Sequence, residues 1–453
     1  MAVISISSCL LIFFFLVAAT LPDLPSAYLK LPLLRKNPYP PAPSEALFAD
    51  SRRVSALYSA LHQRHRHFHA KLPITSAASF GSGQYLVSVH LGTPPQRLLL
   101  VTDTGSDLTW VTCSACRQNC SSRATFFPRQ STTFSPYHCF DSSCKLVPHP
   151  REHVPCNHSR LHSTCRYEYS YSDGSVSRGF YSHETTTFNS SSGKLVQFQY
   201  LSFGCGFNNS GPSVSGPSFN GANGVMGLGR GPISFFSQLG RQFGHKFSYC
   251  LMDYTLSPPS TSYLLIGGSK YRGAKRYKLS FTPLLSNPLS PTFYYIGIDS
   301  VFVNNVKLHI SPSVWAIDEL GNGGTVVDSG TTLTFLKEPA YRIILATVDR
   351  LVKLPKSVEP SLGFDLCFNV SNELRPSLPR LSFKLGGGSL FAPPPRNYFI
   401  DAADGVKCLA LQPVKPSSGF SVIGNLMQQG YTFEFDKDRM RLGYSRHGCA
   451  GPS

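Results

Sequence analysis

Charged residues are scarce in this chain of 453 residues, where they make up 15% against 42% for hydrophobic residues. The formal net charge is +17, yet no long run of Lys or Arg occurs. A nucleic-acid-binding protein is expected to carry a basic patch interleaved with aromatic residues, so the sequence argues against nucleic acid as a partner. Attraction to acidic surfaces, such as cell-wall polysaccharide, explains the positive charge more simply.

The start of the chain also has little charge, since no charged residue precedes Asp23. Residues 9–19 form the apolar run CLLIFFFLVAA, and small residues come after it, which is typical of a secretory signal peptide. An uncleaved membrane anchor is the alternative. Pro22, Pro25 and the lack of basic flanking residues favour cleavage, so we expect residues 1–27 to be a signal peptide.

A hydrophobic C-terminal tail is lacking after Cys449, which argues against a glycolipid anchor. With the signal peptide, this predicts a secreted protein without a stable membrane anchor, located in the apoplast or cell wall. The vacuole or another endomembrane compartment is the alternative destination.

Cysteine usage agrees with secretion. Cys9 lies in the signal segment, and the even number that remains implies a disulfide framework. Cys113 and Cys116 have the spacing of a zinc site, but no second C-x-x-C or pair of His occurs at a useful distance, so we expect no metal. Five N-x-S/T sequons are candidate glycosylation sites: Asn119, Asn157, Asn189, Asn208 and Asn369.

Residues 28–78 differ from the later part of the chain because they contain no cysteine and are rich in Pro and basic residues. The stretch SEALFADSRRVSALYSALHQR has apolar residues at helical spacing, and HQRHRHFHA holds four His that gain charge as the pH falls. We expect a propeptide with one helix that covers an acidic cleft until activation. A solvated linker is the alternative.

From Gly81 onward the pattern is one of short strands. Runs such as QYLVSVHLG and RLLLVTDTG are separated by turn signals such as GTPP, SDGS and GNGG. The 37 Gly and 35 Pro suit a turn-rich β protein. We therefore predict an all-β fold.

An internal repeat divides this region. Residues 101–111 (VTDTGSDLTWV) resemble residues 326–336 (VVDSGTTLTFL), and each copy is succeeded by an apolar-apolar-Gly segment, at 224–229 and at 421–426. Two similar lobes, each providing one acidic loop, are the natural interpretation. We place the N-terminal lobe at residues 79–288 and the C-terminal lobe at residues 289–453.

The acidic loops suggest a hydrolytic pair, Asp103 and Asp328. Two carboxylates close together cannot both ionise, so they share one proton. The ionised member can take a proton from water while the protonated member polarises a peptide carbonyl. This chemistry needs no cofactor. A single D-T-G is an ordinary turn sequence, but two copies within matched apolar frames predict a catalytic pair.

The flanking residues suit that task. Glycine allows each loop to turn sharply and approach the other, and hydroxyl groups can donate to the carboxylates or bond across the lobe interface. These supporting residues are Thr104, Gly105, Ser106, Ser329, Gly330 and Thr331.

These motifs resemble the pepsin-type aspartic protease family, and within it the plant nepenthesin-like group. The resemblance covers about residues 80–449 and rests on DTGSDLTW, YSYSDGS, FGCG, NGVMGLGRGPISFFSQL, KFSYCL, GGTVVDSGTTLTFL, CLAL and SVIGNLMQQ. It implies a bilobal all-β fold with a central cleft that is closed by a flap hairpin.

The resemblance also assigns residues. Asp103 and Asp328 match the catalytic pair, and Tyr171, in a turn with Gly174, matches the flap tyrosine that covers bound peptide. Tyr169 is the alternative for that role. Trp110 matches the tryptophan that pairs with the flap tyrosine, and the glycines of two interlocking loops behind the active site match Gly227 and Gly424.

Disulfide pairings are implied only by the resemblance, because sequence alone does not determine connectivity. They are Cys113–Cys116, Cys120–Cys205, Cys139–Cys165, Cys144–Cys156, Cys250–Cys449 and Cys367–Cys408.

The expected function is that of a secreted, monomeric aspartic endopeptidase that acts on proteins or peptides at acid pH. The alternative is a binding protein, because some plant relatives keep this fold, lose the catalytic pair and inhibit glycoside hydrolases. Such relatives have a degraded second motif, whereas both motifs are intact here. A structural wall glycoprotein is a third interpretation, and it leaves the acidic pair unexplained.

Overall fold

The structure, a computed structural model, describes residues 29–35, 84–114, 125–150, 156, 163–171, 174–189, 195–211, 214, 219, 222–252, 262–267, 278–357, 363–414 and 419–446. The predicted signal peptide and the predicted propeptide helix lie outside these residues. Within the described part of the chain, no helix is long and apolar enough to cross a membrane.

Strands dominate both halves of the chain, which confirms the all-β prediction. The first half contains β1 (Leu29–Arg35), β2 (Tyr85–Leu91), β3 (Gln96–Asp103), β4 (Trp110–Thr112), β5 (Ser135–Pro136), β6 (Arg166–Ser170), β7 (Val176–Asn189), β8 (Leu195–Ser210), β9 (Gly224–Gly227), α2 (Phe235–Phe243), β10 (Lys246–Cys250) and β11 (Ser262–Ile266). Alternating burial in the second part of β2 matches its alternating apolar residues, whereas the continuous apolar run of β3 leads into four buried residues that end at Asp103.

The second half is built from shorter strands and one longer helix. It contains β12 (Ser280–Leu285), β13 (Tyr295–Ile296), β14 (Ile298–Val303), β15 (Val306–Lys307), β16 (Thr325–Val327), β17 (Thr334–Lys337), α3 (Glu338–Leu351), β18 (Cys367–Asn369), β19 (Leu381–Leu385), β20 (Leu390–Phe391), β21 (Phe399–Ala403), β22 (Val406–Leu409), β23 (Leu411–Val414), β24 (Ser421–Ile423), α4 (Asn425–Gln428), β25 (Thr432–Asp436) and β26 (Arg441–Ser445).

The sequence repeat is also a repeat of strand pairing. In the first half, β3 runs parallel to β9, while β4 runs parallel to β8 and antiparallel to β9. In the second half, β16 runs parallel to β24, while β17 runs parallel to β23 and antiparallel to β24. The two acidic motifs therefore lie at equivalent places in two copies of one topology.

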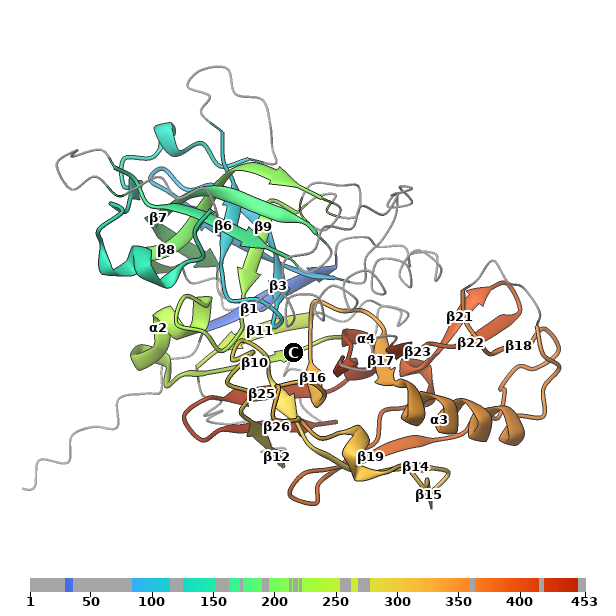
Figure 1. The fold of residues 1–453 in the computed structure, drawn as a ribbon. Helices are drawn as coiled ribbons and strands as arrows, with labels where there is room; N and C mark the ends of the chain where they lie inside the picture. Colours follow the sequence, from blue (N-terminus) through green and yellow to red (C-terminus); the bar gives the residue numbers. More distant parts are fainter. Residues whose placement is uncertain are drawn as a thin grey trace, which may run out of the picture.

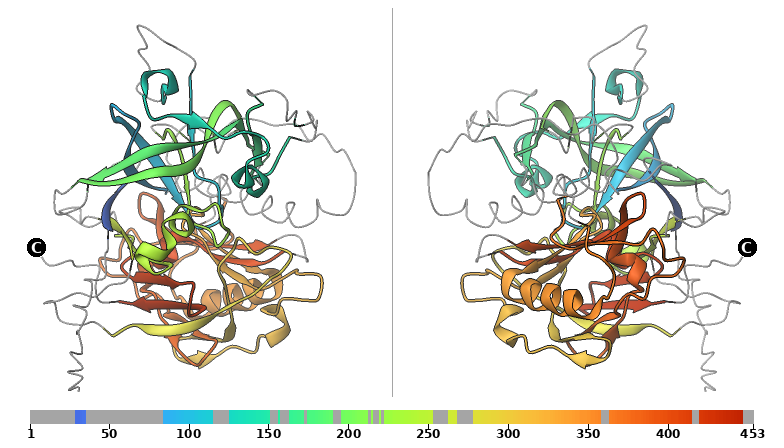
Figure 2. Two further views of the ribbon diagram at one scale, coloured as in Figure 1. Left: turned by 90° about the vertical axis from the view of Figure 1, so that its left-hand side faces the viewer. Right: turned by 90° about the vertical axis from the view of Figure 1, so that its right-hand side faces the viewer.

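A central antiparallel layer joins the halves (Figure 1), with neighbouring strands in the order β2, β1, β11, β10, β25, β26 and β12. Its core is aromatic: the rings of Phe247 and Phe435 are stacked with centroids 4.6 Å apart. The two side views in Figure 2 show the blue and green strands of the first half above the orange and red strands of the second half.

Strand β1 is a feature that the sequence did not predict. It lies inside the predicted propeptide, and it pairs antiparallel with β2 and with β11. The start of the predicted propeptide is therefore held by backbone hydrogen bonds in the central layer.

The disulfides differ from most of the implied pairings. Cys113 is bonded to Cys205, Cys139 to Cys156 and Cys144 to Cys165. The pairings Cys113–Cys116, Cys120–Cys205, Cys139–Cys165 and Cys144–Cys156 are therefore wrong. The physical reason is topological: β4 runs parallel to β8 with Val111 opposite Cys205, so the end of β4 brings Cys113 to that strand.

The remaining pairings concern the second half and the chain end. Cys367 and Cys408 stand opposite each other in β18 and β22 and are bonded, as the resemblance implied. Cys250 is disulfide-bonded, but Cys449 lies outside the described residues, so the pairing of these two stays a prediction. Because Cys113 is oxidised, its thiolate is not available as a zinc ligand.

Candidate active site

Asp103 is the last residue of β3, beside Gly227 of β9, and it is almost fully buried. The backbone N–H of Gly105 donates to Oδ1 of Asp103 at 2.9 Å, and the hydroxyl of Ser106 donates to Oδ2 at 2.6 Å. Both oxygens of the carboxylate are therefore oriented by the loop that begins at the end of this strand.

Asp328 has the same surroundings in the second half. It comes directly after β16, its backbone N–H donates to the carbonyl of Ile423 in β24, and it is fully buried. The N–H of Gly330 donates to Oδ1 at 2.9 Å, and the hydroxyl of Thr331 donates to Oδ2 at 2.7 Å. The two carboxylates thus share one local geometry, as the matched motifs predict.

Hydroxyl groups tie the two loops to each other. The N–H of Ser329 donates to Oγ1 of Thr104 at 2.9 Å, and the N–H of Thr104 donates to Oγ of Ser329 at 3.2 Å. Thr104 Oγ1 also lies 3.3 Å from the carbonyl of Val327 and 3.5 Å from Oδ1 of Asp328. These reciprocal contacts bring the two acidic loops together from opposite halves of the chain.

The glycines of the two apolar-apolar-Gly segments allow these segments to pack closely against the acidic loops. A Cβ on Gly227 would lie 2.4 Å from the backbone of Asp107, and a Cβ on Gly424 would lie 2.0 Å from the carbonyl oxygen of Leu333. Only glycine can stand at these two positions without displacing the loop.

The β6–β7 hairpin places the predicted flap residues. Its turn is closed by hydrogen bonds from Tyr171 N to Ser175 O and from Gly174 N to Tyr171 O, and Gly174 has a φ of +80°. The indole N–H of Trp110 donates to the hydroxyl of Tyr171 at 2.6 Å. The structure therefore joins the two residues that the resemblance pairs.

Tyr169, the alternative flap residue, has a different contact. Its hydroxyl accepts the backbone N–H of Asp107 at 3.1 Å, so it is tied to the first acidic loop. Burial raises the pKa of both Tyr169 and Tyr171 well above the ordinary value, and the nearby charge of Asp103 raises it further. Both hydroxyls therefore stay neutral at any pH at which a shared-proton pair operates.

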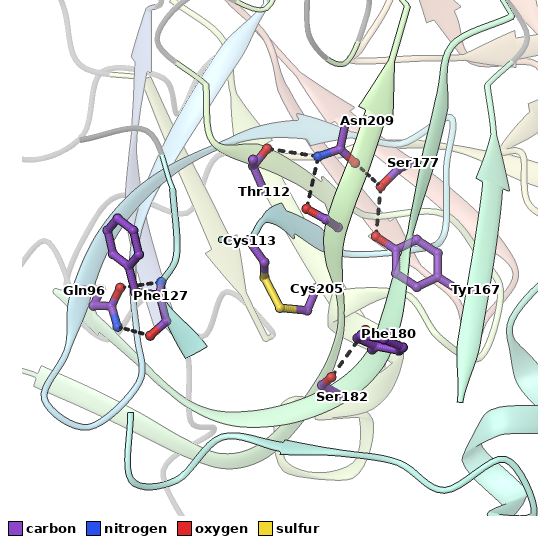
Figure 3. The surroundings of a disulfide bond; sticks show 11 residues. Gln96, Thr112, Cys113, Phe127, Tyr167, Ser177, Phe180, Ser182, Cys205 and Asn209 are labelled. Carbon is purple, nitrogen blue, oxygen red and sulfur yellow. Dashed lines mark hydrogen bonds between the residues drawn. A yellow bond between two sulfur atoms is a disulfide. The ribbon is translucent and has the colours of Figure 1, made fainter. Parts of the chain in front are cut away.

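A network between the hairpin and β8 connects the hairpin to the neighbourhood of the Cys113–Cys205 disulfide (Figure 3). Asn209 donates to Thr112 Oγ1 at 3.3 Å and accepts from Ser177 at 2.7 Å, and the hydroxyl of Ser177 lies 2.8 Å from that of Tyr167. The disulfide joins β8 to the residue directly after β4, so it braces the strand that carries Trp110.

Sequence reasoning missed several polar residues that form hydrogen bonds with the acidic loops. The amide of Gln428 accepts a hydrogen bond from Tyr249 at 2.5 Å and donates to the carbonyl of Asp328 at 3.3 Å, while the amide of Asn425 donates to the carbonyl of Ser329 at 3.0 Å. The signal was present as polar residues inside the apolar motifs KFSYCL and SVIGNLMQQ. Asp107, within DTGSD, is a further case.

Two of the five sequons stand at exposed positions, Asn208 and Asn369. The side chain of Asn189 and the residues Asn119 and Asn157 lie outside the described part of the structure. Glycosylation at all five stays a prediction. Among the described residues, no group of three or more His, Cys, Asp or Glu side chains is placed to hold a metal ion.

The duplicated topology and the paired acidic loops define a pepsin-like aspartic protease fold. Two family models match the chain: one described as xylanase inhibitor N-terminal over residues 85–268, and one described as xylanase inhibitor C-terminal over residues 293–446.

Curated relatives identify the family. The chain is 35% identical over 419 residues to aspartyl protease family protein 2 of Arabidopsis thaliana, covering 90% of this chain and 81% of the relative. It is 36% identical over 376 residues to aspartic proteinase nepenthesin-1 of Nepenthes gracilis, covering 82% and 79% of the two chains. The chain belongs to the pepsin-like aspartic protease family.

Solved structures share the fold. The crystal structure of edgp matches with a TM-score of 0.68 at 22% identity, covering 93% of this chain and 95% of the other. Basic 7S globulin from soybean matches with a TM-score of 0.64 at 19% identity, covering 94% and 96%. At this identity the likeness concerns the fold alone.

Proposed function

We propose that the protein is a secreted aspartic endopeptidase that cleaves peptide bonds at acid pH through Asp103 and Asp328. The observation that carries the proposal is the reciprocal hydrogen bonding of Thr104 and Ser329, which brings two equally oriented carboxylates together. Relatives named as aspartic proteases and nepenthesins support the same activity.

The reaction depends on the shared proton. One carboxylate is ionised and accepts a proton from a water molecule, whose oxygen attacks the peptide carbonyl carbon. The protonated carboxylic acid donates its hydrogen to the carbonyl oxygen, so a tetrahedral diol forms without a covalent bond to the protein. Collapse of the diol breaks the C–N bond, and a proton passes to the leaving nitrogen. Loss of the shared proton at higher pH would stop the reaction.

The substrate in this proposal is an extended peptide held in a cleft between the halves, beneath the β6–β7 hairpin. An extended peptide presents alternating side chains to alternating pockets. Tyr171 offers apolar surface beside the first acidic loop, and it is held there by Trp110, whose indole is fully buried and stacked against Phe219. We propose large apolar side chains on both sides of the scissile bond.

Residues 28–78 act as a propeptide in this account. The pairing of β1 with β2 and β11 supports a segment that is docked on the body of the enzyme. Acidification would charge the four His of HQRHRHFHA and weaken the contacts of the basic segment with acidic groups.

The test is cleavage of a denatured protein by the acid-treated full-length chain, with and without a statine-type transition-state inhibitor. We expect inhibitor-sensitive cleavage at acid pH and almost none at neutral pH. An optimum above pH 7 would contradict the shared-proton mechanism.

A second candidate is a non-catalytic binding protein, which the description of the family models as xylanase inhibitor favours. Intact hydroxyl and glycine partners at both acidic residues argue against it here. A folded chain that is inert towards peptides from pH 2 to 7 would make this second function the better one.

A further inference from the structure

The two acidic loops differ at one position. The first loop has a second carboxylate there, and the second loop has a threonine. Asp107 stands four residues after Asp103, and Thr332 stands four residues after Asp328. Asp107 takes no part in the shared-proton mechanism, yet its carboxylate has specific partners.

The carboxylate of Asp107 is held between the halves. The backbone N–H of Gly231 donates to Oδ1 at 2.7 Å, and the hydroxyl of Thr292 donates to Oδ2 at 2.6 Å. A Cβ on Gly229 or on Gly231 would lie only 2.3 Å from a carboxylate oxygen of Asp107. The GLGRG segment therefore leaves space that the carboxylate fills.

Successive amides of that segment connect the first acidic loop to the second half. Leu228 N donates to Asp103 O, Gly229 N to Ser106 O, Arg230 N to Thr292 O and Gly231 N to Asp107 Oδ1. The hydroxyl of Tyr294 completes the connection by donating to the carbonyl of Leu228 at 2.7 Å. A rigid path thus runs from Asp103 through Asp107 to the junction of the halves.

Lys437 and Asp103 are the charged groups that act on Asp107, and Arg230 lies in the same segment as its partner Gly231. Lys437, in the turn between β25 and β26, donates to Arg230 O at 2.9 Å, and the guanidinium of Arg230 donates to Leu285 O at 2.9 Å. Burial raises the pKa of Asp107, while Thr292, Gly231 and the charge of Lys437 partly offset that rise. The charge of Asp103 raises it further, and the other titratable neighbours are Tyr169 and Tyr294.

We propose that Asp107 is a positioning residue that holds the first acidic loop against the second half and, through its charge, makes the catalytic pair retain its shared proton to higher pH. This inference rests on the proposed peptidase function. Like charges disfavour each other's ionised form, so an ionised Asp107 opposes complete ionisation of the pair. Lys437 favours the ionised form of Asp107, because its positive charge lowers the pKa of that carboxyl group.

Burial raises the pKa of Asp107, so its charge is smallest at the acid end of the pH profile, and this makes its effect asymmetric. At the acid end Asp107 is itself protonated, so its replacement leaves the acid limb in place. The ionised form grows as the pH rises and opposes ionisation of the pair, so replacing Asp107 lets the pair lose the shared proton at lower pH. The structure thus predicts a shift of one limb only.

The experiment compares kcat–pH profiles of the wild type, Asp107→Asn and Thr292→Val. Asp107→Asn keeps the shape of the side chain. It should lower the midpoint pH of the neutral-side limb by roughly half to one pH unit and leave the midpoint of the acid limb unchanged. Thr292→Val removes the hydroxyl that stabilises the ionised carboxylate without changing any charge, so it should also lower the midpoint pH of the neutral-side limb. The control Asp401→Asn removes an exposed carboxylate that pairs with Lys407, and should move neither limb.

Titration of the catalytic pair by NMR in carboxyl-labelled protein gives a second measurement that does not require turnover. A lower midpoint pH of the neutral-side limb in both variants supports the proposal, and Thr292→Val alone still tests it if Asp107→Asn does not fold. Shifts of both limbs together, shifts of opposite sign in the two variants, or no shift in either variant, overturn the proposal. An inactive wild type refutes the peptidase function instead, and the NMR titration still decides the role of Asp107.

Discussion

The hydroxyl of Thr104 is the contact on which the alignment of the two acidic loops depends most directly. Thr104→Val keeps the shape of the side chain but removes the acceptor of the Ser329 N–H at 2.9 Å and the donor to the Val327 carbonyl at 3.3 Å. Both backbone groups are in fully buried residues. An unpaired buried polar group costs about 1–3 kcal/mol, so we expect a loss of about 2–4 kcal/mol in the free energy of unfolding.

Denaturant-induced unfolding at the pH of maximal activity measures this loss, and kcat on a peptide substrate measures the alignment of the loops. We expect kcat to fall by more than about tenfold, equivalent to about 1.4 kcal/mol in the barrier. Thr347→Val in α3 is the matched control, because its hydroxyl bonds only to the carbonyl of Ile343 within the same helix. A Thr104→Val protein as stable and active as that control would refute the role of the interlobe contacts.

Substrate choice, processing and the pH dependence of stability give three further expected outcomes. Cleavage-site profiling should find large apolar residues on both sides of the scissile bond, and a profile of only charged residues there would contradict the proposed pockets. N-terminal sequencing of the active enzyme should show the loss of roughly the first 75 to 80 residues, whereas an active form that begins near residue 28 would make the segment a linker. Because burial raises the folded-state pKa of Asp107 above its ordinary 3.8, protonated Asp107 favours the folded state. The stability of the wild type relative to Asp107→Asn should therefore be greatest below about pH 3.8 and should decline as the pH rises through the raised pKa. Calorimetric unfolding over that range measures it, and an increase with pH would contradict the burial argument.

Much of the fold could be predicted from the sequence because the motifs are local and duplicated. The repeat of residues 101–111 at 326–336 predicts two equivalent acidic loops, and the parallel pairs β3–β9 and β16–β24 place them equivalently. The hydroxyl residues beside each aspartate have short-range partners, so their contacts with the carboxylates could be expected.

Other features depend on contacts between distant segments. The disulfide of Cys113 with Cys205 spans 92 residues and results from the parallel pairing of β4 with β8, which spacing alone does not reveal. Strand β1 joins the central layer through β2 and β11. Its sequence LKLPLLR alternates, but the Pro in the middle argues against a strand with neighbours on both sides. Asp107 was missed for the same reason, because Thr292 meets it from 185 residues away.

The catalytic pair is the central claim, and Asp103→Asn, Asp328→Asn and the double variant test it most directly. The measurement is kcat for cleavage of a denatured protein at acid pH, with the fold checked by the unfolding transition of each variant. We expect each single variant to lose nearly all activity and the double variant to lose little more, because the two carboxylates act as one unit. A folded single variant that keeps more than about a tenth of the wild-type kcat, a change in the barrier below about 1.4 kcal/mol, would contradict the two-carboxylate mechanism.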